Sequence, residues 1–294
     1  MESTVALGWS LLQLFHRSHI TWHKPYYLLD FRHMTVFHKF VRYKDIILYR
    51  TLAGIKSEAR QNYLGYVWFL AEPILSTAVL YFAWSQINGS KGFEAVLTIL
   101  IGMVAWGWFE GSVMNGATAI KAKFHVLSQF DLPKYIFPVV TILVNSWKSM
   151  FVFGIILVMA LVNGHASIHL VWLPVIVFVQ FFLIVGLTLL ISIGVTLLND
   201  LNTVMATVFR LLFFVSGLFF TSATVREVSP EVYSLFCWNP IAVLIDAYRA
   251  VMQRGESPDL FLLCRAAAIA FAFFVVGLLV NAYYDKKILK LTNV

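Results

Sequence analysis

Charged residues are scarce in this sequence: they make up 13% of its 294 residues, whereas hydrophobic residues make up 60%. A soluble domain of this length carries about 25% charged residues, which it needs to cover its surface. The mean hydropathy of +0.79 reflects the same shortage. The composition therefore excludes a water-soluble globular protein and predicts an integral membrane protein with a lipid-exposed surface.

The alternating pattern of a β-barrel is also missing. A transmembrane strand needs segments of about ten residues in which apolar and polar residues alternate, whereas the apolar runs here are long and continuous. We therefore predict an all-α membrane protein with six transmembrane helices of about 20 residues each. The six predicted spans are residues 64–87, 95–118, 138–162, 171–198, 203–222 and 262–284.

Two further segments are apolar but unsuited to crossing a bilayer. The short pieces 225–235 and 236–248, between the fifth and sixth spans, are interrupted by proline and are predicted to be re-entrant helices. Residues 38–60 have charged residues in every turn and are predicted to be an amphipathic helix at the cytoplasmic interface. The chain then divides into a cytoplasmic N-terminal segment, 1–63, and a transmembrane domain, 64–294.

Lysine and arginine are distributed unevenly along the chain. Fifteen lie in residues 1–63, in the loop after the second span and in the C-terminal tail, whereas five lie on the opposite side. The positive-inside rule therefore predicts that both termini are cytoplasmic and that the protein lies in the bacterial inner membrane. The net charge of +7 reflects this topology and an attraction to anionic membrane lipid, so we expect no nucleic-acid partner.

Motifs for catalysis are absent. The chain has no G-x-x-x-x-G-K-[ST] loop for nucleotide phosphates, no G-x-S-x-G and no H-E-x-x-H. Cys237 and Cys264 lack a metal-type spacing, and His16, His19 and His23 share a helix face without an acidic or cysteine ligand. We therefore predict a transport subunit rather than an enzyme, without a metal or cofactor of its own; any ATP hydrolysis would take place on another chain.

Five ionisable residues interrupt the predicted spans, where charge is costly and often functional. They are Glu72, Glu110, Lys148, Arg210 and Arg265. Glu72, Arg210 and Arg265 lie close enough to helix ends to snorkel to the interface. Glu110 and Lys148 are predicted to pair between neighbouring helices, which is a structural role rather than a proton relay.

Three segments carry patterns of a known family. The start of the first span fits a basic residue followed by L-G-x-x-W-x-x-x-x-P, with Arg60, Leu64, Gly65, Trp68 and Pro73. The loop between the second and third spans carries Leu132-Pro133-Lys134, and N-P-x8-R precedes the last span, with Asn239, Pro240 and Arg249. In this order, over about residues 40–290, the segments resemble ABC-2 type permeases of polysaccharide exporters for O-antigen, capsule or teichoic acid. One departure is Asn199 before Asp200, where such permeases often have a basic residue.

The resemblance implies a homodimer of this chain in the membrane, docked on two ABC ATPase subunits that bind ATP and Mg²⁺. A lipid-linked polysaccharide, O-antigen first among them, would pass between spans one and five of both copies. The implied ATPase-docking residues are Lys44, Asp45, Arg50, Lys121, Lys123, Leu132 and Lys134. The implied channel residues are Trp68, Tyr81, Trp84, Trp106, Phe213, Phe214 and Phe220. The implied outer gate contains Trp238, Asn239, Pro240, Asp246 and Arg249.

Three alternatives bear on these residues. An ABC-2 permease for a drug or a small lipid would have the same topology. A membrane-embedded transferase acting on lipid-linked sugars would need a catalytic carboxylate, for which Asp200 and Asp246 are the candidates. Asp246 and Arg249 are also predicted to form an i, i+3 pair that stabilises a short helix.

Overall fold

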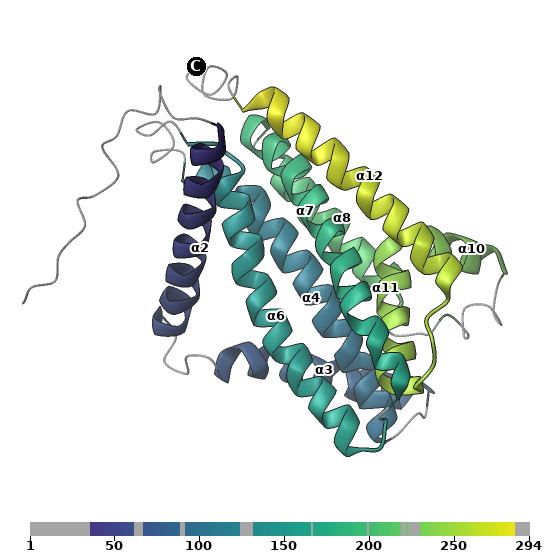
Figure 1. Cartoon of the computed structure of the whole chain (residues 1–294). Helices are drawn as coiled ribbons and strands as arrows, with labels where there is room; N and C mark the ends of the chain where they lie inside the picture. The colour runs from purple at the N-terminus through teal and green to yellow at the C-terminus, as the bar shows by residue number, and fades with distance from the viewer. Residues whose placement is uncertain are drawn as a thin grey trace, which may run out of the picture. The chain divides into compact units, whose positions relative to one another are not determined.

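The computed structural model describes residues 36–61, 67–88, 92–123, 132–165, 167–198, 200–218, 222 and 230–285. The chain divides into two compact units, Met1–Val41 and Arg42–Val294. Of the first unit, only the beginning of helix α2 (Val36–Gln61) is described. The described residues form helices and turns, with no strand among them (Figure 1). This confirms the predicted all-α class.

Five helices are long and apolar enough to cross a membrane. They are α3 (Val67–Asn88), α4 (Phe93–Ala122), α6 (Ile136–Val162), α7 (Leu173–Leu197) and α12 (Leu260–Tyr284). A 3-10 turn, η3 (Ile168–Trp172), leads directly into α7. These helices coincide with the first four predicted spans and the last one.

The fifth predicted span is shorter in the structure. Helix α8 (Leu201–Val215) has 15 residues, or about 22 Å of helix, against a hydrocarbon core of about 30 Å. Beyond it lie two short helices, α10 (Pro230–Trp238) and α11 (Pro240–Arg249), followed by the π-helical turn η4 (Ala250–Arg254). The two short helices are confirmed as helices, while the count of six spans and the re-entrant placement stay predictions.

Helix α4 is the central helix of the second unit. It contacts α3, α6, α7, α8 and α11, and most of its middle is buried. Polar side chains of neighbouring helices reach its backbone: Gln180 Nε2 donates to the Ala105 carbonyl at 2.8 Å, and Asn145 Nδ2 to the Gly111 carbonyl at 3.2 Å. Such bonds join helices in a setting that offers no water as an alternative partner.

Helices α7 and α12 cross at two glycines. A Cβ at Gly186 would collide with the backbone of Phe273 and Phe274, and a Cβ at Gly277 would lie 2.5 Å from the carbonyl oxygen of Gly186. Small residues at a crossing point allow two helix backbones to approach closely and gain packing contacts. In Figure 1, α12 lies along α7 at the edge of the bundle.

Helix α2 lies along α6. The guanidinium of Arg50 lies 5.8 Å from the centre of the Phe137 ring, and further along both helices Glu58 Oε2 lies 2.8 Å from Lys148 Nζ. A Cβ at Gly54, between these two points, would lie 2.9 Å from Val144. The predicted helix is therefore confirmed, and it packs lengthwise on α6; its place at the cytoplasmic interface stays a prediction.

Candidate functional site

Helices α3 and α8 leave much of their surface uncovered within one chain. Both helices pack on α4, but only 6% of the apolar window of α3 is buried. Large apolar side chains point outward from both helices: Val67, Trp68, Ile74, Leu75, Val79 and Phe82 on α3, and Val204, Val208, Leu211, Phe214 and Val215 on α8. On α4, Met103, Gly107, Gly111 and Asn115 recur at helical spacing and are half-buried or exposed; all four also line the cavity described below. We call the outward surface of α3 and α8 the α3–α8 face.

The inner side of α8 is held on α4 by aromatic rings. Phe209 and Phe213 pack against Trp106 with ring centres 6.2 and 5.7 Å apart, and Phe209 packs against Phe109 at 5.4 Å. Trp106 is buried beneath α8. The implied role of Trp106 as a channel-lining residue is therefore corrected, because its ring lies behind α8 and forms part of the core.

The other implied channel residues are less enclosed. Phe214 and Trp68 are exposed, whereas Tyr81, Trp84 and Phe213 are half-buried. Tyr81 also has a structural contact, because its hydroxyl accepts a hydrogen bond from the Gly92 amide at 3.1 Å, at the turn into α4. Phe220 lies outside the described residues.

The intramembrane charges have partners that sequence reasoning missed. Glu110 Oε2 accepts a 2.6 Å hydrogen bond from Trp106 Nε1, one turn earlier on the same helix. Lys148 pairs with Glu58, so the predicted pairing of Glu110 with Lys148 is wrong. The i, i+4 spacing of Trp106 and Glu110 was a signal for this bond.

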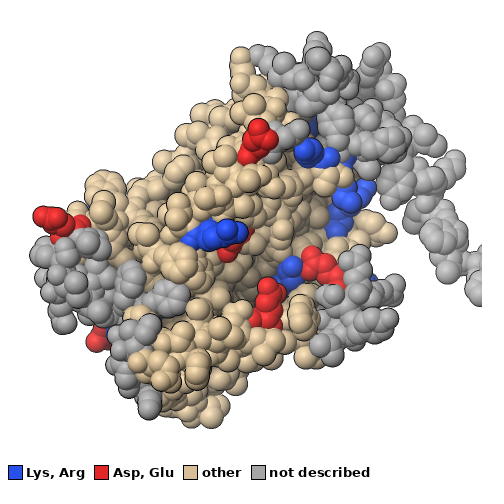
Figure 2. Space-filling model, turned by 180° about the vertical axis from the view of Figure 1, so that it is seen from behind, with Lys and Arg blue, Asp and Glu red and all other residues tan. Residues whose placement is uncertain are grey.

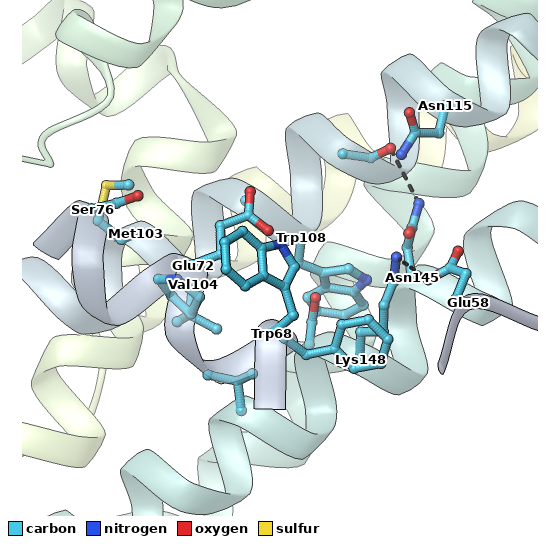
Figure 3. A pocket seen from close by; sticks show the side chains of 16 residues that line it. Glu58, Trp68, Glu72, Ser76, Met103, Val104, Trp108, Asn115, Asn145 and Lys148 are labelled. Carbon is cyan, nitrogen blue, oxygen red and sulfur yellow. Dashed lines mark hydrogen bonds and ion pairs between the residues drawn. The ribbon is translucent and has the colours of Figure 1, made fainter. Parts of the chain in front are cut away.

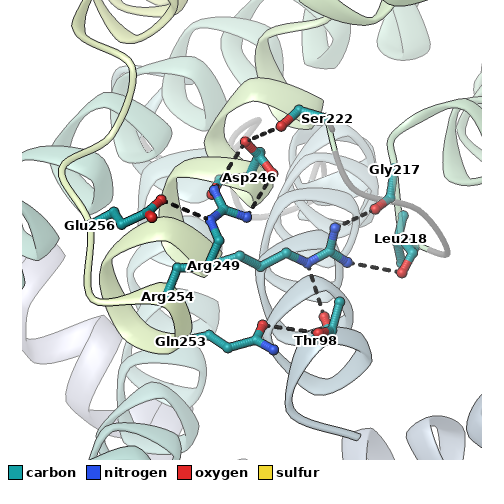
Figure 4. Close-up of polar contacts among 9 residues, drawn as sticks. All are labelled: Thr98, Gly217, Leu218, Ser222, Asp246, Arg249, Gln253, Arg254 and Glu256. Carbon is teal, nitrogen blue, oxygen red and sulfur yellow. Dashed lines mark hydrogen bonds and ion pairs between the residues drawn. The ribbon is translucent and has the colours of Figure 1, made fainter. Parts of the chain in front are cut away.

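Arg249 occupies the centre of a polar cluster near the start of α4 (Figure 4). Arg249 is 1% exposed, and its guanidinium donates to three backbone carbonyls of the described residues. Nε lies 3.0 Å from the Thr98 oxygen, Nη1 2.6 Å from the Gly217 oxygen and Nη2 2.9 Å from the Leu218 oxygen. Gly102 provides the space, since a Cβ there would lie 2.8 Å from Nη2.

Asn239 binds the same turn from the other end of α11. Its Oδ1 accepts from the Ile241 amide at 3.2 Å, which caps the helix, and its Nδ2 donates to Ser216 Oγ at 3.1 Å. Pro240 occupies the first helical position, where its missing amide hydrogen costs nothing. Asn239 and Arg249 thus hold the turn 216–218 that follows α8, and we call this arrangement the outer clamp.

Asp246 does not form the predicted pair with Arg249. Its carboxylate binds Arg254, with Oδ1 3.3 Å from Nη1, and accepts a 2.8 Å hydrogen bond from Ser222 Oγ. Arg254 also lies 3.6 Å from Glu256. The pairing is corrected because α11 turns the Arg249 side chain inward, toward α4 and α8, and leaves Asp246 facing the turn of Arg254.

Arg265, at the start of α12, also binds within the protein. Its Nη2 donates to the Cys237 carbonyl at 2.5 Å, and its guanidinium lies 5.1 Å from the centre of the Trp238 ring. Both cysteines are free thiols, with Cys237 buried and Cys264 exposed. Among the described residues no group of His, Cys, Asp or Glu is arranged to hold a metal; His16, His19 and His23 lie outside them.

The implied ATPase-docking residues fall into two groups. Lys44, Asp45, Arg50, Lys121 and Lys123 are exposed, as docking residues should be.

Lys134 is different, because its side chain is 5% exposed and its Nζ lies 3.7 Å from Asp285 Oδ1. The same carboxylate oxygen accepts a 2.9 Å hydrogen bond from the Lys134 amide. Burial, with smaller contributions from Tyr43 and Asp285, raises the pKa of the neighbouring Tyr135 hydroxyl. Lys134 therefore ties the loop before α6 to the end of α12, beside the half-buried Leu132.

A cavity of about 410 Å³ opens between α3, α4 and α6, beside the end of α2 (Figure 3). Trp68 and Glu72 line it from α3, Trp108 from α4 and Lys148 from α6. Figure 2 shows the molecule from behind, with acidic and basic side chains around a hollow in a face that is otherwise mostly uncharged. We call this space the α3–α6 cavity.

Proteins similar to this chain are permeases. The O-antigen export system permease protein RfbA of Myxococcus xanthus is 24% identical over 231 residues, which cover 78% of this chain and 88% of the relative. Two proteins of the same name from Klebsiella pneumoniae are 22% and 21% identical over 214 residues, each match covering 72% of this chain and 81% of the relative. No protein-family profile matches the chain.

Proposed function

We propose, from the premise that this chain is a relative of the ABC-2 type permeases of polysaccharide exporters, that it is the membrane-spanning subunit of an O-antigen exporter. The observation that carries the proposal is the similarity to three O-antigen export permeases over most of both chains. The sequence motifs and the apolar helices of the structure agree with it. Export would be driven by ATP hydrolysis on a separate ABC ATPase subunit with Mg²⁺.

The sixth crossing of the membrane is made by α8 together with the turn 216–218. Phe209 packs on Trp106 and Phe109, and the Leu218 carbonyl is held by Arg249 beside Thr98. Helix α8 therefore runs antiparallel to α4, and the turn after α8 lies beside the second turn of α4. Six crossings place both termini on one side, and the lysines and arginines at that end indicate the cytoplasm.

Two copies of the chain meet through their α3–α8 faces, and the glycan passes between these two faces. Its exposed apolar side chains support this role, because the rest of the chain covers little of the surface of α3 and α8. On α4, Gly107 is exposed and Gly111 is half-buried, and both line the cavity between α3, α4 and α6, which leaves room beside α3. Trp68 and Phe214 are the aromatic residues on this face that a sugar ring would meet first.

Coupling to the motor would pass through the cytoplasmic end of the bundle. The exposed charges of α2 and of the end of α4 are available for docking. The contacts of α2 with α6 and of Lys134 with Asp285 connect these segments to the membrane helices. At the other end, the outer clamp would keep the gate closed, since it fixes the turn after α8 to α4 and α11.

The test is biochemical assembly. The chain, expressed with the ABC ATPase of the same export system, should purify as a complex with two copies of each subunit, and ATP turnover should depend on the intact complex. In cells without the chain, lipid-linked O-antigen should accumulate on the cytoplasmic side. Full export in the absence of any ATPase would overturn the proposal, and a deletion with a drug phenotype and no glycan phenotype would assign the chain to a different substrate class.

A further inference from the structure

Three of the five ionisable residues that interrupt the predicted spans have polar partners inside the chain: Glu110, Lys148 and Arg265. The other two are Glu72 on α3 and Arg210 on α8, and both are exposed. Neither side chain forms an ion pair or a hydrogen bond with any residue that the structure describes. Figure 3 shows Glu72 apart from the ion pair of Lys148 with Glu58. Within the described part of the chain, one anion and one cation are therefore left unpaired.

Both charges lie on the α3–α8 face. On α3, Glu72 belongs to an exposed stripe at helical spacing whose other members are aromatic or aliphatic: Trp68, Leu75, Val79 and Phe82. On α8, Arg210 belongs to a second exposed stripe, whose other members carry no charge: Thr203, Thr207 and Phe214. Each stripe therefore carries a single charge in an uncharged setting, and the two charges have opposite signs.

The two charges also lie at a similar depth along α4. Glu72 lines the α3–α6 cavity together with Gly107 of α4. Arg210 follows Phe209, whose ring packs against Phe109 of α4. Gly107 is about 21–22 Å of helix from either end of α4. Both charges are therefore near the middle of the bundle, where a charge without a partner is most costly.

A second copy of the chain can supply both missing partners. Helix α3 packs on the side of α4 that carries Gly107, and α8 packs on the side that carries Trp106. When two copies meet face to face around a two-fold axis along the membrane normal, α3 of each copy lies opposite α8 of the other. Such an axis preserves depth, so Glu72 and Arg210 of different copies meet at the same level.

The chemistry of the two side chains suits this contact. A guanidinium presents its N–H donors in a planar fork that fits both oxygens of a carboxylate. A lipid headgroup is a poorer partner for either residue, because headgroups lie at the membrane surface and these charges lie near the middle of the bundle.

We propose that Glu72 of one copy pairs with Arg210 of the other, so that two symmetric ion pairs join the dimer within the membrane. The inference rests on the proposed function only for the face through which the two copies meet. The pairs give that face its specificity, since the exposed apolar side chains around them would pack against many apolar surfaces. They also fix the register of α3 against α8 of the partner copy.

The test measures dimerisation of the full-length chain in lipid vesicles, by energy transfer between two labelled populations. Glu72→Arg and Arg210→Glu each place like charges opposite each other at both pairs, so each variant alone should dimerise at least about tenfold more weakly than the native chain. A mixture of the two variants distinguishes pairing between copies, because the two arginines of one chain then face the two glutamates of the other. Mixing should restore dimerisation to within about threefold of the native chain.

Neutral variants provide a second measurement that does not depend on tolerance of a reversed charge. In a double-mutant cycle with Glu72→Gln and Arg210→Gln, the double variant should dimerise no more weakly than the weaker single variant, because the second change removes a charge that has already lost its partner. Glu231→Arg is the control, at an exposed position in the first turn of α10 and outside both stripes. It should dimerise as the native chain does.

Three results would each overturn the proposal. They are unchanged dimerisation in both charge reversals, complete additivity in the neutral cycle, and rescue by combining Glu72→Arg with Arg210→Glu in one chain but not by mixing the single variants, which would place the pair within a single copy. A chain whose mixed variants regain dimerisation but which assembles with no ATPase refutes the export function only. A chain that exports O-antigen with its ATPase but whose mixed variants stay apart refutes the ion pairs only.

Discussion

Asn239 and Arg249, at opposite ends of α11, bind neighbouring residues of a single turn. Asn239 Nδ2 donates to the Ser216 hydroxyl at 3.1 Å, and Arg249 Nη1 donates to the Gly217 carbonyl at 2.6 Å. The eight residues between Pro240 and Arg249 form just enough helix to bring both side chains to the turn after α8. The N-P-x8-R pattern in the sequence therefore corresponds to a clamp on that turn.

Arg249→Lys should destabilise the protein strongly. A lysine has one nitrogen and cannot reach three carbonyls in different directions, so buried acceptors lose their partners at a cost of about 2–4 kcal/mol. Thermal unfolding in detergent measures the loss. Arg254→Lys, at a partly exposed arginine that contacts Asp246 and Glu256, is the control and should cost less than about 1 kcal/mol. Similar losses in both variants would contradict the clamp.

Asn239→Asp should separate the two functions of this side chain. The carboxylate keeps the cap on the Ile241 amide but cannot donate to Ser216. In Asn239→Ala both contacts are lost, and we expect it to cost about 1–2 kcal/mol more than Asn239→Asp. A double-mutant cycle of Asn239→Ala with Ser216→Ala measures the contact between them. Complete additivity would show that the 3.1 Å bond contributes nothing to stability.

Gly186→Ala should loosen the crossing of α7 and α12. The added methyl group collides with the backbone of Phe273 and Phe274, and overpacking of this kind costs about 1–3 kcal/mol. Gly154 on α6 provides the control, because nothing lies within 4 Å of a Cβ added there. Gly154→Ala should leave the melting temperature unchanged or raise it, since alanine favours the helix by up to about 1 kcal/mol.

Lys134→Glu should act by destabilising the protein. The substitution places a carboxylate beside Asp285 in a buried position, at an expected cost of about 2–4 kcal/mol. The charge exchange Lys134→Asp with Asp285→Lys should restore part of the melting temperature. Lys123→Glu, at an exposed position near the end of α4, should leave it unchanged. If the charge exchange rescues nothing, the ion pair is not the reason for the loss.

Arg50→Glu should uncouple ATP turnover from export without unfolding the protein. Arg50 is exposed on α2, in a segment that we propose docks on the ATPase, and reversing its charge replaces attraction at that surface with repulsion. ATP turnover of the purified complex and surface O-antigen are measured together, with the melting temperature as the check on folding. Normal export by this variant would remove Arg50 from the docking surface.

Hydropathy was sufficient to predict the positions of the long helices. The spans predicted at 95–118 and 138–162 lie inside α4 and α6, because apolar runs of this length have few alternatives in a bilayer. The fifth span was harder to predict, since Arg210 interrupts a short helix whose continuation depends on the turn held by Arg249. The lengthwise packing of α2 on α6 has no signal in the hydropathy of α2.

The pairing of charges could not be predicted from spacing alone. Asp246 and Arg249 have the spacing of an i, i+3 pair, but Arg249 enters the protein, where carbonyls on α4 and after α8 compensate its charge. Trp106 was expected on a channel surface as an aromatic residue of a span, and it is buried because α8 covers it. Lys134 has the positive charge expected of a docking residue, but it is buried because Asp285 at the end of α12 pairs with it.

The amino-acid sequence by itself determined the solvent, the class and the family resemblance of this protein, because the transfer free energy of long apolar runs into lipid and the order of short motifs are local properties. Only the tertiary structure decided which side chains meet: the outer clamp, the partners of the intramembrane charges and the α3–α6 cavity. The physical reason is that each of these depends on residues brought together from separate helices, and the energy of such contacts exists only when the helices have packed.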